Sequence, residues 1–136
     1  MIHLLDINVM IAAAWPAHIA HGPTVRWFAR RQSTGVLDIA TCPLTELGFL
    51  RLSLVLKGYA PDLAQAQEAL RLLMQGSQRR HHFWSDALPA RRLPDWVLGP
   101  QQITDGYLVA LVVKNSGRLV TLDTSIPTHA AVELIA

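Results

Sequence analysis

The sequence has a single cysteine, few charged residues and no long hydrophobic run, and each shortage argues against a class of protein. Cys42 has no partner for an internal disulfide, which fits a reducing compartment. Apolar residues make up 51% and charged residues 16%, a balance that argues against disorder. No apolar stretch reaches the roughly 18 residues of a membrane helix, and the start lacks the basic segment of a signal peptide. We therefore expect residues 1–136 to form one cytoplasmic domain.

The chain is mildly basic, with a formal net charge of +2 and a pI of about 9.1. If four carboxylates described below bind metal, 6 of the 10 acidic residues remain against 12 basic ones. Such a surface suits a phosphate-rich partner or an acidic protein segment. Two segments expected to be loops, 78–82 and 91–96, are either simply solvated or make this contact. Their arginines are Arg79, Arg80, Arg91 and Arg92.

Short apolar runs alternate with segments of helical periodicity along the chain. Strands are expected around residues 3–6, 36–40, 83–85, 118–123 and 132–135. Helices are expected over 9–14, about 19–31, 43–55, from Asp62 to before Gly76, and 100–115. In the third helix, Leu44, Leu47, Leu50, Leu54 and Val55 are predicted to form the buried face. The alternation predicts an α/β fold with parallel strands and right-handed crossovers.

A carboxylate, Asp6, follows the first apolar run. At the C-terminal end of a strand in an open α/β sheet, such a side chain faces the crevice where these folds bind ligands. The alternative is that Asp6 only caps the helix that begins near Val9. A functional interpretation is favoured because three more carboxylates have similar local settings: Glu46, Asp105 and Asp123.

These four carboxylates are predicted to converge at one edge of the sheet. Asp123 ends a strand as Asp6 does, whereas Glu46 and Asp105 lie in first turns of helices, where they could merely compensate a helix dipole. Four carboxylates in one cleft repel one another unless protons or cations compensate them. Oxygen ligands suit Mg²⁺ or Mn²⁺, which can activate water and neutralise charge on a phosphoryl group. With a basic surround, the indicated substrate is a phosphodiester.

Two further features have weaker functional interpretations. His18 and His21 are spaced to share a helix face and bind a metal, but the sequence offers no third ligand. Cys42 precedes Pro43 at an expected helix start, and a small buried cysteine is a better interpretation than a catalytic thiol.

Four segments resemble motifs of the PIN-domain nucleases, and more closely of the VapC toxins of bacterial toxin–antitoxin pairs. They occur in the expected order and span nearly the whole chain: Leu4–Val9, Thr41–Arg51, Ile103–Leu108 and Leu119–Asp123. The chain departs from the family mildly after Asp123, where members often continue with a charged residue and then an aromatic. Here residues 124–127 read Thr-Ser-Ile-Pro, which puts the substrate contacts of this loop in doubt.

The resemblance implies a PIN-like three-layer α/β/α sandwich with a central, mainly parallel sheet. It also implies a Mg²⁺- or Mn²⁺-dependent endoribonuclease that cleaves structured RNA, such as tRNA or rRNA, by metal-activated water and slows translation. Asp6 and Asp105 would be the main metal ligands, and Asp123 would complete the site. Glu46 would hold metal-bound water or act as a base.

Further implications of the resemblance concern supporting residues and partners. Asn8 and Thr104 would orient the ligands. The family is usually dimeric, and a VapB antitoxin inhibits it by placing its C-terminal tail in the site.

Two other functions remain open from the sequence. Asp6 could be the nucleophile of a phosphotransferase, although the Asp-x-Asp type of phosphatase would need a second carboxylate where Asn8 stands. The chain could also be a non-catalytic α/β binding module that retains the fold.

Overall fold

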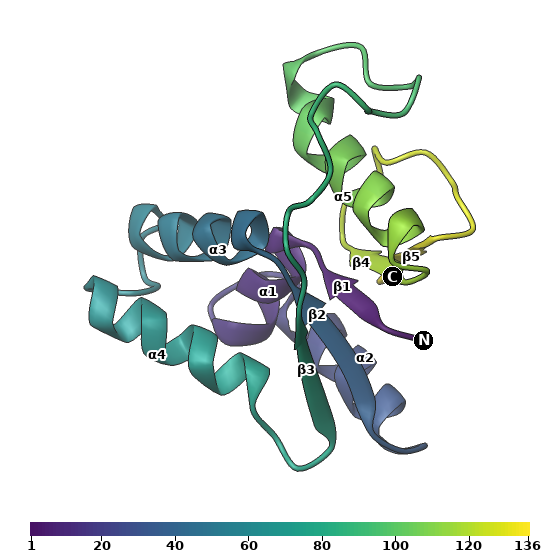
Figure 1. Cartoon of the computed structure of the whole chain (residues 1–136). Helices are drawn as coiled ribbons and strands as arrows, with labels where there is room; N and C mark the ends of the chain where they lie inside the picture. Colours follow the sequence, from purple (N-terminus) through teal and green to yellow (C-terminus); the bar gives the residue numbers. More distant parts are fainter.

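The computed structural model describes all 136 residues and contains one five-stranded sheet (Figure 1). The strands occur in the order β3-β2-β1-β4-β5, and every neighbouring pair is parallel, which confirms the predicted α/β class. No helix is both long and apolar enough to span a membrane. In chain order the elements are β1 (His3–Leu5), α1 (Ile7–Ala14), α2 (His21–Gln32), β2 (Leu37–Thr41), α3 (Pro43–Val55), α4 (Leu63–Met74), β3 (Arg79–Phe83), η1 (Pro100–Gln102), α5 (Ile103–Lys114), β4 (Arg118–Thr121) and β5 (Val132–Leu134).

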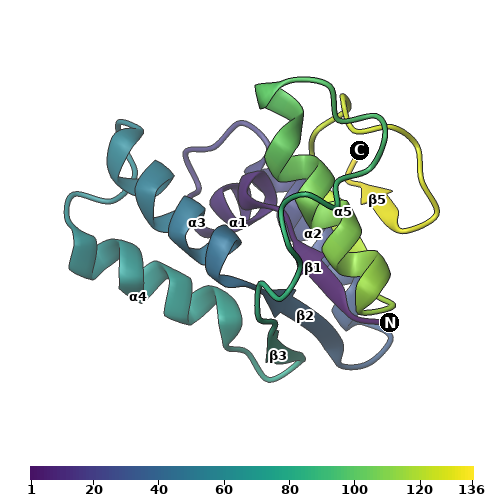
Figure 2. The ribbon, with the colours of Figure 1, turned by 45° about the horizontal axis from the view of Figure 1, so that its top comes forward.

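Helices cover both faces of the sheet and make three layers, as the resemblance implied (Figure 2). Successive residues of a strand point to opposite faces, so Leu5 and Leu4 belong to different cores. Leu5 packs in a cluster with side chains from α1, α2, α3 and α4. Leu4 packs in a second cluster, which is formed largely by α5. The central strands are therefore apolar on both faces, which is typical of a parallel sheet between helical layers.

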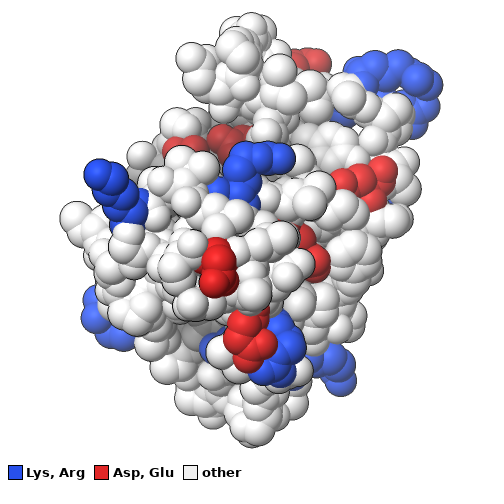
Figure 3. All heavy atoms as spheres, turned by 90° about the vertical axis from the view of Figure 1, so that its left-hand side faces the viewer, with Lys and Arg blue, Asp and Glu red and all other residues white.

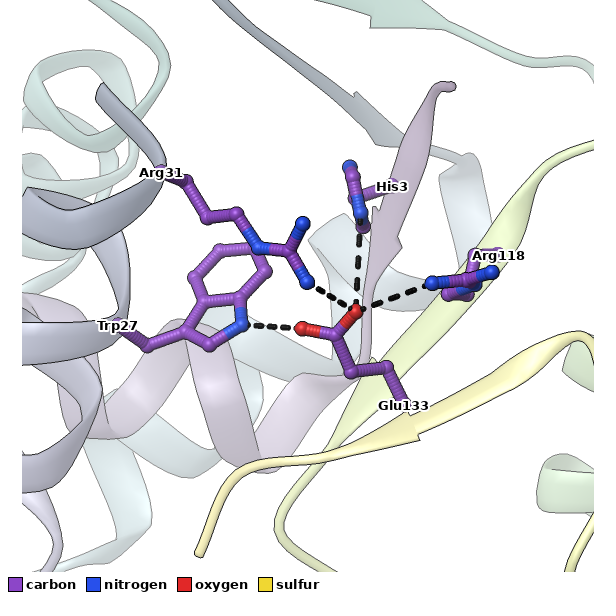
Figure 4. A network of polar contacts seen from close by, with 5 residues as sticks. All are labelled: His3, Trp27, Arg31, Arg118 and Glu133. Atoms are coloured by element: carbon purple, nitrogen blue, oxygen red, sulfur yellow. Dashed lines mark hydrogen bonds and ion pairs between the residues drawn. The ribbon is translucent and has the colours of Figure 1, made fainter. Parts of the chain in front are cut away.

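A polar network attaches the last strand to the start of the sheet and to α2 (Figure 4). Glu133 on β5 accepts hydrogen bonds from the Arg31 guanidinium at 2.5 Å and the Trp27 indole. Arg118 and His3, which begin β4 and β1, approach the same carboxylate at 3.4 and 3.9 Å. Burial favours the neutral acid, but the bonds from Trp27 and Arg31 outweigh it and lower the pKa of Glu133. The network therefore holds an ionised carboxylate among cationic groups.

The predicted strand over 83–85 and the predicted loop over 78–82 are wrong, because β3 is formed by Arg79–Phe83. This is an edge strand, paired only with β2, and it has little apolar surface to bury. Its side chains find polar partners instead: Arg80 and His82 contact Asp38 on β2. Hydrogen-bonded neighbours therefore stabilise a strand whose sequence lacks the usual hydrophobic alternation.

The buried face predicted for α3 is wrong for three of its five residues, whereas Leu44 and Leu50 are partly buried and pack against the two cores. Leu47, Leu54 and Val55 are 57%, 42% and 70% exposed. The buried residues of this helix are Thr45, Gly48, Phe49 and Ser53. A Cβ at Gly48 would lie 2.3 Å from the Ile7 side chain, so α1 packs where the helix has small residues. Close helix packing therefore selects this face over the leucine-rich one.

Candidate active site

The order of the strands changes direction beside β1, between β1 and β4. The chain adds β2 and β3 on one side of β1, and later β4 and β5 on the other. In open α/β sheets, the crevice at the carboxyl ends of the strands at such a point is the usual ligand site. Asp6 directly follows β1, and Asp123 comes two residues after the end of β4. The sheet thus directs these two segments to the same edge.

Asp6 is buried and bonded to both neighbouring elements. It is 4% exposed; one carboxylate oxygen accepts the Ile7 N–H at 2.8 Å and the other accepts the Thr121 hydroxyl at 2.6 Å. Asp6 therefore caps α1, as the alternative interpretation held, and also ties β1 to β4. Burial raises the pKa of Asp6 and the Asp123 charge adds to this, while the two hydrogen bonds oppose it.

The turn after β4 is fixed by polar side chains around Asp123. The Thr121 hydroxyl accepts the Asp123 N–H at 3.0 Å, and the Asn8 amide oxygen accepts the Leu122 N–H at 3.2 Å. Asp123 itself accepts the N–H and the hydroxyl of Ser125 at 2.8 and 2.7 Å. These bonds from Ser125 lower the pKa of Asp123. Asn8 therefore orients the backbone of the turn that carries Asp123.

Asp105, in the first turn of α5, completes a group of three interacting carboxylates. Its pKa is raised to about 7, first by burial, then by the charges of Asp6 and Asp123 and by a hydrogen bond with Asp123. We call Asp6, Asp105 and Asp123 the aspartate cluster. Below about pH 7, Asp105 retains a proton because full ionisation of the cluster is unfavourable.

Glu46 makes its contacts on the other side of β1, with β2 and β3. One oxygen of its carboxylate accepts the Thr41 hydroxyl at 2.6 Å, and the Thr41 oxygen lies 2.7 Å from His81 Nε2. Its charge acts on His81, whereas the three aspartates act on one another. Of the four predicted carboxylates, the structure therefore brings three into one cluster and gives Glu46 a separate hydrogen-bond partner.

The aspartate cluster fits a hard divalent cation by its chemistry. Its donors are all carboxylate oxygens, the ligands that Mg²⁺ and Mn²⁺ prefer. The charges of Asp6 and Asp123 raise the pKa of Asp105, and a bound cation would compensate these negative charges. In this structure, however, no three Asp, Glu, His or Cys side chains have the spacing of a formed metal site. The cluster is therefore a candidate site by composition and charge.

The predicted arginines differ in how the fold uses them. Arg79 donates to Gln32 at 2.6 Å and to the Leu73 carbonyl at 2.8 Å, and its guanidinium lies 4.5 Å from the Phe28 ring centre. Arg80 forms a two-bond ion pair with Asp38 at 2.6 and 3.1 Å. Arg91 and Arg92, by contrast, are exposed and form no ion pair.

Charged side chains are scattered among uncharged atoms on the side of the molecule that carries α3 and α4 (Figure 3). This side therefore shows no continuous basic surface. Thr104, beside Asp105, makes no side-chain hydrogen bond, so the orienting role predicted for it has no contact to support it here.

The other candidates of the sequence have structural roles. His18 accepts the Ala20 N–H at 2.9 Å, and His21 Nδ1 lies 2.7 Å from the Ala12 carbonyl oxygen. The two histidines thus bond separate backbone groups. Cys42 is fully buried, as predicted, and burial raises the pKa of its thiol.

Three polar residues of the site were not predicted from the sequence: Thr41, His81 and Thr121. Both threonines are the last residues of strands, and each donates its hydroxyl to a carboxylate that follows or neighbours the strand. A threonine at the end of an apolar run that leads to a carboxylate could have indicated them. His81 gave no such signal, because its segment was expected to be a loop.

Among models of known protein families, none matches the chain. Comparison with curated proteins finds relatives in Mycobacterium tuberculosis (strain ATCC 25618 / H37Rv). "Ribonuclease VapC39" is 36% identical over 143 residues, which cover 99% of this chain and 98% of that protein. "Ribonuclease VapC38" is 35% identical over 129 residues and "Ribonuclease VapC44" 34% over 132, each covering 93% of this chain and 89% of the relative. The similarity therefore extends over nearly complete chains.

Proposed function

The chain belongs to the VapC ribonuclease family, and from that premise we propose that it is a Mg²⁺- or Mn²⁺-dependent endoribonuclease, the toxin of a type II toxin–antitoxin pair. The observation that supports this most is the aspartate cluster at the point between β1 and β4 where the strand order changes direction. Three carboxylates whose charges oppose full ionisation favour a cation, and the reaction that best suits such a cation in this family is phosphodiester hydrolysis.

In this proposal each carboxylate has a role that its contacts support. Asp6, Asp105 and Asp123 would hold the cation, with Asp6 oriented by the Thr121 hydroxyl. A bound divalent cation would neutralise charge on the phosphoryl oxygens and make a water molecule more acidic. Glu46 would accept the proton of the attacking water at the carboxylate oxygen that Thr41 does not engage.

The proposed substrate is structured RNA such as tRNA or rRNA, whose cleavage would inhibit translation in the cytoplasm. Arg91 and Arg92 are exposed without acidic partners, and this supports a contact with the RNA backbone or with the antitoxin. Arg79 and Arg80 are engaged within the fold, so their part in such a contact would be smaller.

The proposed partners are a VapB-type antitoxin and a second copy of the chain. A C-terminal antitoxin tail with a basic side chain would complement the charge of the aspartate cluster. Leu47, Leu54 and Val55 share one exposed face of α3, and such an apolar face supports a homodimer.

The phosphotransferase alternative has no observation in its favour. A phosphatase of the Asp-x-Asp type needs a second carboxylate two residues after the nucleophile, whereas Asn8 stands there and its amide oxygen accepts the Leu122 N–H.

Incubation of antitoxin-free protein with total RNA and Mg²⁺, followed by mapping of the new RNA ends, tests the proposal. Wild type should generate discrete ends, EDTA should abolish them, and Asp105→Asn should be inactive. Glu68→Gln, which removes an exposed carboxylate of α4 outside the cluster, is the matched control and should cleave normally. RNA that stays intact with wild type, or equal cleavage by Asp105→Asn, refutes the proposed function.

A further inference from the structure

A chain of hydrogen bonds joins three elements at the carboxyl end of β2. His81 lies on β3, Thr41 ends β2, and Glu46 lies in the first turn of α3. The Thr41 oxygen is 2.7 Å from His81 Nε2 and 2.6 Å from the Glu46 carboxylate. Thr41 is fully buried, so water does not compete for its hydroxyl. No other side chain forms a hydrogen bond with the Glu46 carboxylate.

The direction of these bonds follows from counting protons. The Thr41 hydroxyl has one proton, which it donates to the Glu46 carboxylate. The Thr41 oxygen can then only accept from His81, so His81 Nε2 must carry a hydrogen. Burial, the largest effect, lowers the pKa of His81 and favours a neutral ring. A neutral ring has a single N–H, and the contact with Thr41 assigns it to Nε2.

His82, the next residue on β3, has an unrelated role. Consecutive side chains of a strand point to opposite faces. His82 Nε2 lies 2.9 Å from Asp38, which also pairs with Arg80. The two adjacent histidines thus form a natural matched pair, of which only His81 reaches Thr41.

We propose that His81 is a positioning residue that acts through Thr41 to fix the carboxylate of Glu46 for RNA hydrolysis. This rests on the proposed function, in which Glu46 accepts a proton from water. The hydrogen bonds from His81 through Thr41 to Glu46, which we call the relay, hold one oxygen of the Glu46 carboxylate and leave the other available. Without it, the Glu46 side chain is free to rotate about its own bonds, and the fraction of molecules with a correctly placed base falls.

Two substitutions of His81 separate this role from simple packing. His81→Phe keeps the ring but removes the donor, whereas His81→Gln removes the ring but keeps an N–H at a similar reach. We expect His81→Phe to lower kcat by about 10- to 100-fold with little change in KM, the usual effect of losing a group that orients a site. His81→Gln should retain most of the kcat. If the His81 ring only fills space, His81→Phe should instead retain more of the wild-type kcat than His81→Gln.

Thr41 and His82 provide the remaining comparisons. Thr41→Val, which preserves shape but removes the hydroxyl, should match His81→Phe, and Thr41→Ser should match wild type. His82→Phe should leave kcat unchanged. The rates are measured on a synthetic RNA that carries the cleavage site mapped with wild type, and thermal unfolding confirms that each variant is folded.

A readout without RNA or metal tests the relay itself. In ¹⁵N NMR spectra of metal-free protein, the neutral His81 ring should carry its hydrogen on Nε2, and Thr41→Val should shift this signal but not that of His82. A hydrogen on Nδ1 overturns the inference, as does a His81→Phe kcat equal to that of wild type. If wild type cleaves no RNA, the proposed function fails and the positioning role fails with it.

Discussion

Asp105→Asn is expected to stabilise the metal-free protein, because it removes a carboxylate that folding brings close to two others. The pKa of Asp105 is about 7 in the folded protein and 3.8 ordinarily. The folded state therefore binds this proton more tightly than the unfolded chain does. The resulting stabilisation is fully present below pH 3.8 and is lost as the pH rises through 7. Asparagine keeps the shape of the neutral acid and does not incur this loss.

The size of the effect follows from the shift in pKa. Moving from 3.8 to about 7 corresponds to about 4 kcal/mol, an upper limit that applies to a fully buried group. Asp105 is only partly buried, and solvent screening reduces the expected gain to about 2 kcal/mol. In a chain of 136 residues, such a gain should raise Tm by roughly 6 °C.

Thermal unfolding followed by circular dichroism in EDTA, at pH 8 and again near pH 4, measures this gain. The Tm of Asp105→Asn should exceed that of wild type by the whole expected gain at pH 8 and by little near pH 4. Mg²⁺ should raise the Tm of wild type more than that of the variant. Asp95→Asn, at an exposed position, should match wild type throughout. An unchanged or lower Tm for Asp105→Asn at pH 8 refutes the reasoning, since no repulsion would then have been relieved.

Three further predictions concern the rest of the fold. Glu133→Gln should lower the free energy of unfolding by about 1–3 kcal/mol at pH 7 in urea titrations. Because folding lowers the pKa of Glu133, this difference should be present above pH 4.5 and fade as the pH falls below it. Arg79→Met should lower the free energy of unfolding by about 1–3 kcal/mol, because it removes the hydrogen bonds to Gln32 and Leu73. Arg80→Met removes an exposed guanidinium and should lower it by less than about 1 kcal/mol. Equal losses of stability in the two variants would contradict this. The Cys42 thiol, whose pKa burial raises, should react with a disulfide reagent only on unfolding, and rapid reaction of the native protein would disprove its burial.

The sequence predicted the α/β class and the placement of Asp6 and Asp123 because both follow from strand direction. Parallel strands end at one edge of a sheet, so a residue just after the strand is placed whatever its distant contacts are. Asp105 came into the cluster through the packing of α5 against β4, which its apolar helical face made predictable.

The sequence-based predictions were wrong for elements that polar or small residues stabilise. β3 has hydrogen-bonded side chains in place of apolar ones. The local sequence of this strand does not reveal a partner on another strand, such as Asp38. On α3, the apolar spacing predicted burial of Leu47, Leu54 and Val55, which are exposed because Gly48 allows α1 to approach another face of the helix. The bonding of Glu46 was missed for the same reason, since its relay begins on β3.

Thr41 and Thr121 give the two sides of the site a common construction. β2 and β4 flank β1, and each ends in a buried threonine whose hydroxyl donates to a carboxylate. Each hydroxyl has one proton, so in both cases the carboxylate takes it and the threonine oxygen is left to accept from a second group. For Thr121 that group is the backbone N–H of Asp123, and for Thr41 it is His81. The orientation of both carboxylates is thus set by residues at the carboxyl ends of strands of the sheet.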